Sequence, residues 1–207
     1  MTKLWVSSSV LLFLLLGCAQ NNKKNSSLSQ GHLQKLSKQA SVKRQNQQEA
    51  YLNRLVEAEK NRHKEKLRQT YKMPNPQTEE SVYKEVLKAY QIRDLNQLSF
   101  FADRFVELYP DSIFADNSLY LLGQLQLAMG LPGDALQTFD RQLKLFPLGN
   151  KRAAAILGKG VAFRKLGLIN YAASMLNEVK ENYPGSAEYF KVDLEEKLLS
   201  VERAEQK

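Results

Sequence analysis

The sequence contains one cysteine and two histidines in 207 residues. A single cysteine excludes an intramolecular disulfide, so the fold must rest on packing and hydrogen bonds. The histidines, His32 and His63, have no cysteine or paired carboxylates at ligand spacing around them, and we expect no metal site. Proline is scarce too, with six residues in the whole chain, which leaves long stretches able to form helices.

The sequence also lacks a recognisable catalytic or cofactor-binding motif. The "GKG" at Gly158 to Gly160 has neither the glycine spacing nor the terminal Lys-Ser/Thr of a phosphate-binding loop. The neighbouring acids Glu195 and Glu196 would face different directions on a helix, so they cannot act as a pair in one proton transfer. We therefore expect a non-enzymatic protein without a cofactor.

No apolar run reaches the ~20 residues that a membrane-spanning helix requires. The run from Leu4 to Leu16 is shorter, follows Lys3 and precedes a polar tract, which predicts a signal peptide over residues 1–17. Leu15-Leu16-Gly17-Cys18 resembles the lipobox of bacterial lipoproteins. That resemblance implies cleavage before Cys18 and acyl chains on its thiol, and Ala19 then favours an outer-membrane anchor that faces the periplasm. An unlipidated cysteine behind an ordinary cleaved signal is the alternative.

Positive charge is confined to the first part of the chain. From Lys23 to Asn75 there are 13 basic and 4 acidic residues, against 16 and 18 from Pro76 onward. We expect a flexible tether over 18–30 and a long, exposed basic helix over 31–73, ended by the prolines in "MPNPQ". Export excludes nucleic acid as a partner. Two interpretations stay open: the charges solvate the helix, or they contact peptidoglycan or anionic lipid. No apolar heptad is sustained, so the oligomeric state is not predicted.

The remainder of the chain repeats itself. The phrases "ELYPDS", "KLFPLG" and "ENYPGS" place Pro110, Pro147 and Pro184 at intervals of 37 residues. A period of this size predicts stacked helix-turn-helix units. In the middle unit we expect helices over 113–129 and 135–146, with Phe139 packed where small Gly123 lets the helix axes approach. The same interval relates further pairs: Gly123 and Gly160, Gly130 and Gly167, Ala135 and Ala172.

This pattern resembles the tetratricopeptide repeat over residues 79–207. The resemblance implies an all-α fold: a right-handed superhelix of about three repeats plus a capping helix, preceded by the long exposed helix. The expected repeat domain covers 78–207, with repeats at about 79–112, 113–149 and 150–186 and the capping helix at 186–206. The lengthened interval is similar to the C-terminal domain of the Tol-Pal-associated cell-division coordinator family. It is less similar to the tetratricopeptide lipoprotein of the outer-membrane β-barrel assembly machinery.

Such repeats bind partners along the concave face formed by the first helix of each unit. The pattern assigns these residues to that face: Tyr83, Leu87, Tyr90, Tyr120, Gln124, Leu127, Leu157, Val161, Arg164 and Lys165. Aromatic side chains over a groove suit an extended or helical peptide, although each tyrosine could instead pack against the neighbouring repeat. We expect a scaffold lipoprotein that binds a periplasmic or envelope protein in Tol-Pal-type envelope constriction. The alternatives are a subunit of outer-membrane protein assembly and an accessory module of a peptidoglycan enzyme.

Overall fold

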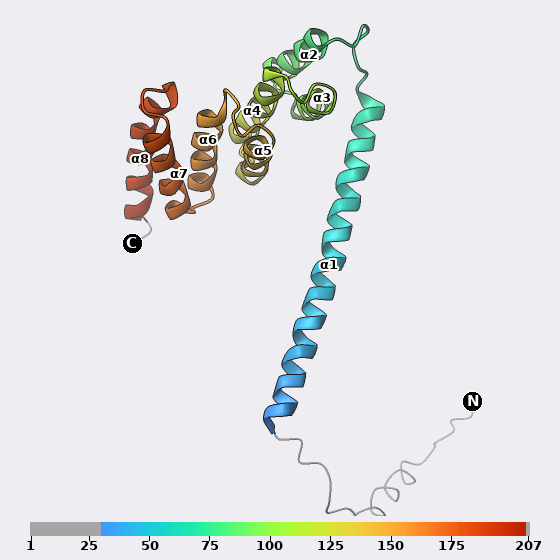
Figure 1. Ribbon diagram of the computed structural model, residues 1–207, viewed down its shortest axis with the longest axis vertical. Coiled ribbons are helices and arrows are strands. Elements are labelled where there is room, and N and C mark those ends of the chain that lie inside the picture. Colours follow the sequence, from blue (N-terminus) through green and yellow to red (C-terminus); the bar gives the residue numbers. More distant parts are fainter. Residues whose placement is uncertain (1–29, 206–207) are drawn as a thin grey trace, which may run out of the picture. The chain divides into compact units, whose positions relative to one another are not determined.

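The computed structural model describes residues 30–205, which form eight α-helices and no strand (Figure 1). The predicted signal peptide, Cys18 and all but the last residue of the predicted tether lie outside the described residues. Within the described chain, two compact units meet between Ala58 and Glu59, inside the first helix. Each unit is described by itself below.

The first helix, α1, runs from Gln30 to Thr70, close to the predicted bounds. Every described side chain from Gln34 to Ala58 is exposed, as its mixture of charged and amide residues predicts. The last three turns belong to the second unit and are not wholly exposed as expected. Leu67 is buried there, and Tyr71, just past the helix end, packs against the same core.

Three helical hairpins and a final helix follow in the second unit. Each hairpin buries the apolar stripe of its two helices, and neighbouring helices pack in chain order (Figure 1). Their bounds are α2 Glu79–Gln91, α3 Leu95–Leu108, α4 Ile113–Ala128, α5 Pro132–Leu145, α6 Arg152–Lys165, α7 Ile169–Asn182 and α8 Ala187–Glu205.

The hairpins begin and end on local signals in the sequence. At the start of α2, Thr78 and Ser81 form a reciprocal cap: the Thr78 hydroxyl accepts the Ser81 N–H at 3.2 Å, and the Ser81 hydroxyl accepts the Thr78 N–H at 2.9 Å. The second helices α3, α5 and α7 start 37 residues apart and end on residues of similar conformation. Those end residues are Tyr109, Phe146 and Tyr183, with φ between −132° and −122°.

The turn inside each hairpin needs one residue in the left-handed region. Gly130 and Gly167 occupy this position in the second and third hairpins, with φ of 75° and 73°. Glycine suits it because it has no Cβ to clash with the following backbone. In the first hairpin the equivalent residue is Arg93, at φ 58°. The first repeat therefore carries a non-glycine residue in a strained conformation that the other two avoid.

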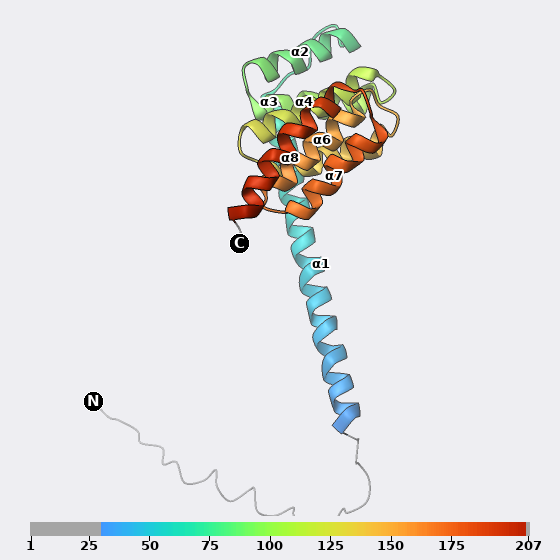
Figure 2. The same cartoon turned by 90° about the vertical axis from the view of Figure 1, so that its left-hand side faces the viewer.

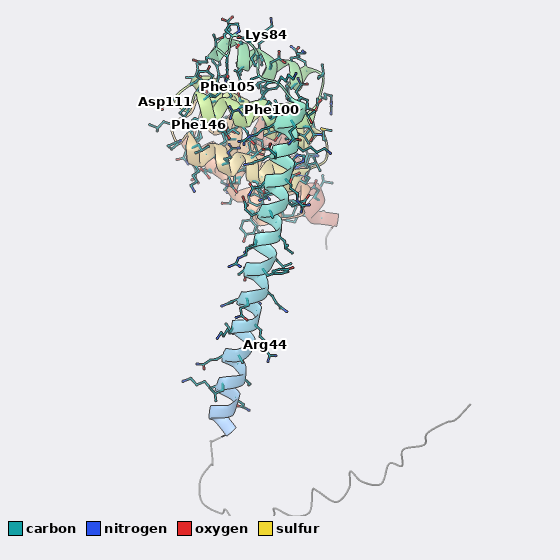
Figure 3. All side chains as sticks on the ribbon, turned by 90° about the vertical axis from the view of Figure 1, so that its right-hand side faces the viewer. Arg44, Lys84, Phe100, Phe105, Asp111 and Phe146 are labelled. Carbon is teal, nitrogen blue, oxygen red and sulfur yellow. The ribbon has the colours of Figure 1, made fainter. Side chains whose placement is uncertain are left out.

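The core consists of apolar side chains between successive helices. Its largest wholly buried members are Phe101 and Phe105 on α3 and Phe139 on α5. Phe100 and Phe105 are labelled on α3 in Figure 3, and Arg44 is labelled on the exposed stretch of α1. The Phe100 ring lies 5.8 Å from the Tyr71 ring, so the end of α1 is joined to the first hairpin by aromatic packing.

Candidate partner-binding groove

A groove of about 420 Å³ lies along one face of α4, α6 and α8. Helix α6 lies between the other two (Figure 1). The lining side chains recur every three or four residues, which places them on one face of each helix. They are Tyr120, Gln124, Leu127 and Ala128 of α4, Ala154, Leu157, Gly158, Val161 and Lys165 of α6, and Glu188, Lys191, Leu194 and Glu195 of α8.

The groove has an apolar floor. Leu127 and Leu157 are each 8% exposed, and Val161 is half-buried beside them. Ala154, in the first turn of α6, and Gly158, one turn further on, also line the groove. The size is that of a site for a few side chains or a small ligand, since such sites span about 300–1,000 Å³.

A buried acid holds α6 in place against α4. The carboxylate of Asp116 on α4, 2% exposed, accepts the backbone N–H of Lys151 at 2.8 Å and the amide of Gln142 at 2.6 Å. Lys151 immediately precedes α6, and its own side chain makes no capping hydrogen bond. Asp116 therefore caps α6 from another helix, where a negative charge is favoured by the helix dipole. Gly149 is needed beside it, because a Cβ at this position would overlap the Asp116 carboxylate.

A partly buried base holds α8 against α6 in a similar way. Arg164 on α6 donates to Glu195 at 2.9 Å and to Glu202 at 2.6 Å, and its side chain is only 13% exposed. Burial disfavours the charge on Arg164, but its hydrogen bonds to the two acids, and their charges, outweigh burial and raise its pKa. These contacts position the helix that forms the third side of the groove.

Tyr120 lies at the side of the groove in an environment that favours its neutral form. Burial raises the pKa of its phenol above the usual 10.0, and the nearby charges of Glu188 and Tyr90 raise it further. The Lys151 ammonium lies 5.8 Å from the centre of the Tyr120 ring, a cation–π distance. The hydroxyl is thus available to a ligand as a hydrogen-bond donor at ordinary pH.

The charges around the groove are mostly paired within the chain. Glu195 accepts from Arg164, and Glu188 lies 3.8 Å from Lys191. Lys165 is exposed at the rim, and no carboxylate among the described residues lies within ion-pair distance of it. A ligand would therefore meet an apolar floor and one cation without an acidic partner.

The structure brings together four of the eight residues predicted for partner binding: Tyr120, Gln124, Leu127 and Lys165. Leu157 and Val161, assigned to the same face, also line the groove. Arg164 does not line it, because its guanidinium is turned toward the acids of α8. The helix carries consecutive residues 164 and 165 about 100° apart, and only the second faces the groove.

The three residues predicted on α2 do not line the groove either. Tyr83 stacks on Phe114 with ring centres 4.5 Å apart and meets the edge of Phe105, so its ring belongs to the core of the first hairpin. Tyr90 packs against that same core. Leu87 remains on the surface of α2, 38% exposed. The alternative of packing against the neighbouring repeat therefore describes Tyr83 well.

Sequence reasoning missed the contribution of α8. It treated residues 186–206 as a cap over the last apolar face, whereas Glu188, Lys191, Leu194 and Glu195 form one wall of the groove. The 37-residue repeat interval could have indicated this role for α8. Helix α8 stands where the first helix of a fourth repeat would begin, and first helices supply the concave face.

Comparison with protein families matches residues 154–186 to the tetratricopeptide repeat. This stretch covers α6, which forms the middle of the groove, and α7. No curated protein matches the sequence. Together with the three hairpins, the match defines an all-α protein with a tetratricopeptide-like helical repeat fold. Such repeats indicate a protein–protein interaction module, and proteins built from them are typically non-enzymatic scaffolds.

Over residues 30–205, no three acidic, histidine or cysteine side chains come together as metal ligands would. None of the helices in this range combines the length and the apolar character needed to cross a membrane.

Proposed function

We propose that the chain is a non-enzymatic scaffold whose groove binds a segment of a protein partner. The observation that carries this proposal is the apolar floor around Ala154 and Gly158 with Lys165 at its rim, which has no ion-pair partner among residues 30–205. A segment that inserts one or two apolar side chains and presents a carboxylate to Lys165 matches both features. The phenol of Tyr120 supplies a hydrogen-bond donor at the opposite side, on α4.

A cross-linking experiment tests the groove directly. A photoreactive amino acid replaces Gln124 in the groove or Lys144, which is exposed on α5 outside it. We expect specific adducts from position 124 only. In the protein with the photoreactive residue at position 124, Lys165→Glu should remove the adducts. Lys144→Glu makes the same charge change outside the groove and should leave the adducts unchanged. Identical adducts from positions 124 and 144 would show that the groove is not the binding site.

We further propose that the partner is a periplasmic or envelope protein and that Cys18 anchors the chain to the outer membrane. The support is the Leu15-Leu16-Gly17-Cys18 sequence and Ala19 behind it. Two or more acyl chains on one cysteine would give a stable anchor, whereas a single chain binds a membrane only marginally. Labelling with a fatty-acid analogue should mark the wild-type protein but not Cys18→Ser. An unlabelled wild-type protein would remove the anchor from the proposal.

The pathway that we propose is Tol-Pal-type envelope constriction, on the resemblance of the lengthened repeats to that coordinator family. Outer-membrane protein assembly and service to a peptidoglycan enzyme are the alternatives. The identity of the protein cross-linked at position 124 separates the three. A component of the constriction apparatus supports the first, whereas a β-barrel assembly subunit or a peptidoglycan synthase or hydrolase would favour one of the others.

A second binding surface is suggested by α1. All its described side chains up to Ala58 are exposed, and they include Lys35, Lys38, Lys43, Arg44 and Arg54. Exposed cations of this density are attracted to polyanionic surfaces in a salt-dependent manner. If they contact peptidoglycan, the protein should co-sediment with purified peptidoglycan at low salt, and replacing these five residues by Gln should abolish this. If both proteins sediment equally, these basic residues do not bind peptidoglycan and serve only to solvate the helix.

A further inference from the structure

The outer face of α8 carries an apolar stripe that the groove does not explain. Its members are Phe190, Leu194, Leu198 and Val201, which are 71%, 61%, 38% and 57% exposed. Residues at spacings of four, eight and eleven lie on one side of a helix. Helix α8 buries Val192 and Leu199 on its other side, so it is apolar on two faces.

No described helix covers this stripe. Of the helices in residues 30–205, α6 and α7 are the two that pack against α8, and Figure 2 shows α8 as the foremost helix of the repeats in that view. The last helix of a repeat array normally presents a polar outer face, because that face meets water. Four large apolar side chains in its place form a patch of the kind that marks an interaction site.

The charges beside the stripe indicate what could cover it. On one edge lie Asp193 and Lys197. On the other edge, Lys191 and Glu202 are already paired within the chain, with Glu188 and Arg164 respectively. In an antiparallel pair of α8 helices, related by a two-fold axis near residues 195 and 196, Asp193 of each copy would face Lys197 of the other.

The apolar residues fit the same arrangement. In the antiparallel pair, Leu194 of one copy would meet Leu198 of the other, and Phe190 would meet Val201. Asp193 forms an ion pair with Lys180 at 3.4 Å, but its side chain is 69% exposed, so its carboxylate can also meet a base of a second copy. Among the described residues Lys197 has no ion-pair partner.

We propose that the protein self-associates through this face, forming an antiparallel dimer in which the two α8 helices pack against each other. The stripe is small, so we expect reversible association with a dissociation constant of roughly 1–100 µM, at the weak end for protein interfaces. The proposal does not depend on the groove, because Leu194 is the only residue that the apolar stripe shares with the groove lining.

Sedimentation velocity over a concentration series tests the interface. The protein should begin at Ala19, which keeps every described residue. Wild type should shift from monomer to dimer with rising concentration, and Phe190→Glu/Leu194→Glu should remain monomeric with unchanged circular dichroism. The matched control is Leu52→Glu/Val56→Glu, which places the same two charges at exposed apolar positions of α1 and should dimerise as wild type does.

Charge reversal tests the antiparallel arrangement separately. Asp193→Lys alone and Lys197→Asp alone should each weaken dimerisation at least tenfold, because each opposes like charges twice. An equimolar mixture of the two single variants should restore it, since both contacts then pair unlike charges across the interface. No contact within one chain can produce that rescue.

Three results would overturn the proposal. They are a wild-type protein that stays monomeric throughout the series, a Phe190→Glu/Leu194→Glu variant that dimerises like wild type, and a mixture of the charge variants that fails to recover. If the wild-type protein stays monomeric, the apolar stripe would instead be a binding site for a helix of a different protein.

Discussion

Gly158 of α6 lies directly against the ring of Phe139 on α5. A Cβ at residue 158 would come within 2.5 Å of the ring atom Cζ, and a Cβ at Gly123 of α4 would come equally close to Cε1 of the same ring. Phe139 is wholly buried, so its ring cannot swing away from either glycine. One aromatic side chain thus sets the spacing of three helices and, through α4 and α6, the width of the groove floor.

Replacing Gly158 by Ala should therefore destabilise the fold. An added methyl group in a full core forces side chains or backbone to shift, which typically costs about 1–3 kcal/mol. Gly133→Ala, in the first turn of α5 where an added Cβ meets nothing within 4 Å, should be neutral or slightly stabilising. Urea unfolding of both variants measures the difference. Equal stability of the two would show that the Phe139 contact is not tight.

Removing the carboxylate of Asp116 should loosen α6. Asp116→Ala leaves the Lys151 N–H and the Gln142 amide without their acceptor, and breaking a buried charged contact costs about 2–5 kcal/mol in the free energy of unfolding. Asp140→Ala removes an acid that is 56% exposed and should cost less than about 1 kcal/mol. Hydrogen exchange of the first turn of α6 locates the effect. If that turn exchanges at wild-type rates in Asp116→Ala, the cap across helices is unimportant.

The strained turn of the first hairpin predicts a stabilising substitution. Arg93→Gly places the residue that tolerates a φ of 58° where Arg now stands, and should raise the free energy of unfolding by about 0.5–1 kcal/mol. The reverse substitution in the second hairpin is Gly130→Ala. It should lower the free energy of unfolding by about 1 kcal/mol, because it introduces the same backbone strain there. Thermal unfolding compares them, and a shift in the same direction for both would contradict the argument.

Alkaline pH should destabilise the protein through Tyr120. Its pKa is raised in the folded chain by burial and by the charges of Glu188 and Tyr90, but has the ordinary value in the unfolded chain. Above about pH 10 the unfolded chain loses this proton first, so the free energy of unfolding falls as pH rises toward the folded pKa. Below that pH both states hold the proton and the effect vanishes. Tyr120→Phe should flatten this decline, and Glu188→Gln should lower the Tyr120 pKa in an absorbance titration.

Local features of the fold could be predicted from the sequence because neighbouring residues cause them. The helices end near the prolines at 110, 147 and 184 and the glycines at 130 and 167. The regular 37-residue interval predicted the hairpins. The contact of Gly123 with Phe139 also followed, since both positions belong to one repeat. The contact of Gly158 with Phe139 could not be predicted in this way. The repeat interval pairs Gly123 with Gly160, and a Cβ at Gly160 would meet Leu176 instead.

The groove shows the same division. Six of its nine residues on α4 and α6 were predicted, because a helix places every third or fourth side chain on one face. Arg164 and Tyr83 have the same periodicity, yet the acids of α8 engage one and the ring of Phe114 stacks on the other. Periodicity states which way a side chain points from its own helix, but not which neighbour occupies that space.

The sequence by itself determined the helices, their turns and the existence of a repeated unit, because propensity, capping and spacing act within a few residues. Only the tertiary structure decided that α8 forms a wall of the groove, that Asp116 caps α6, and that Phe190, Leu194, Leu198 and Val201 remain uncovered. These are contacts, or missing contacts, between segments far apart in the sequence. Asp116 and Lys151 are 35 residues apart, for example, and Arg164 and Glu202 are 38 apart. They depend on how whole helices stack, which no short stretch of sequence specifies.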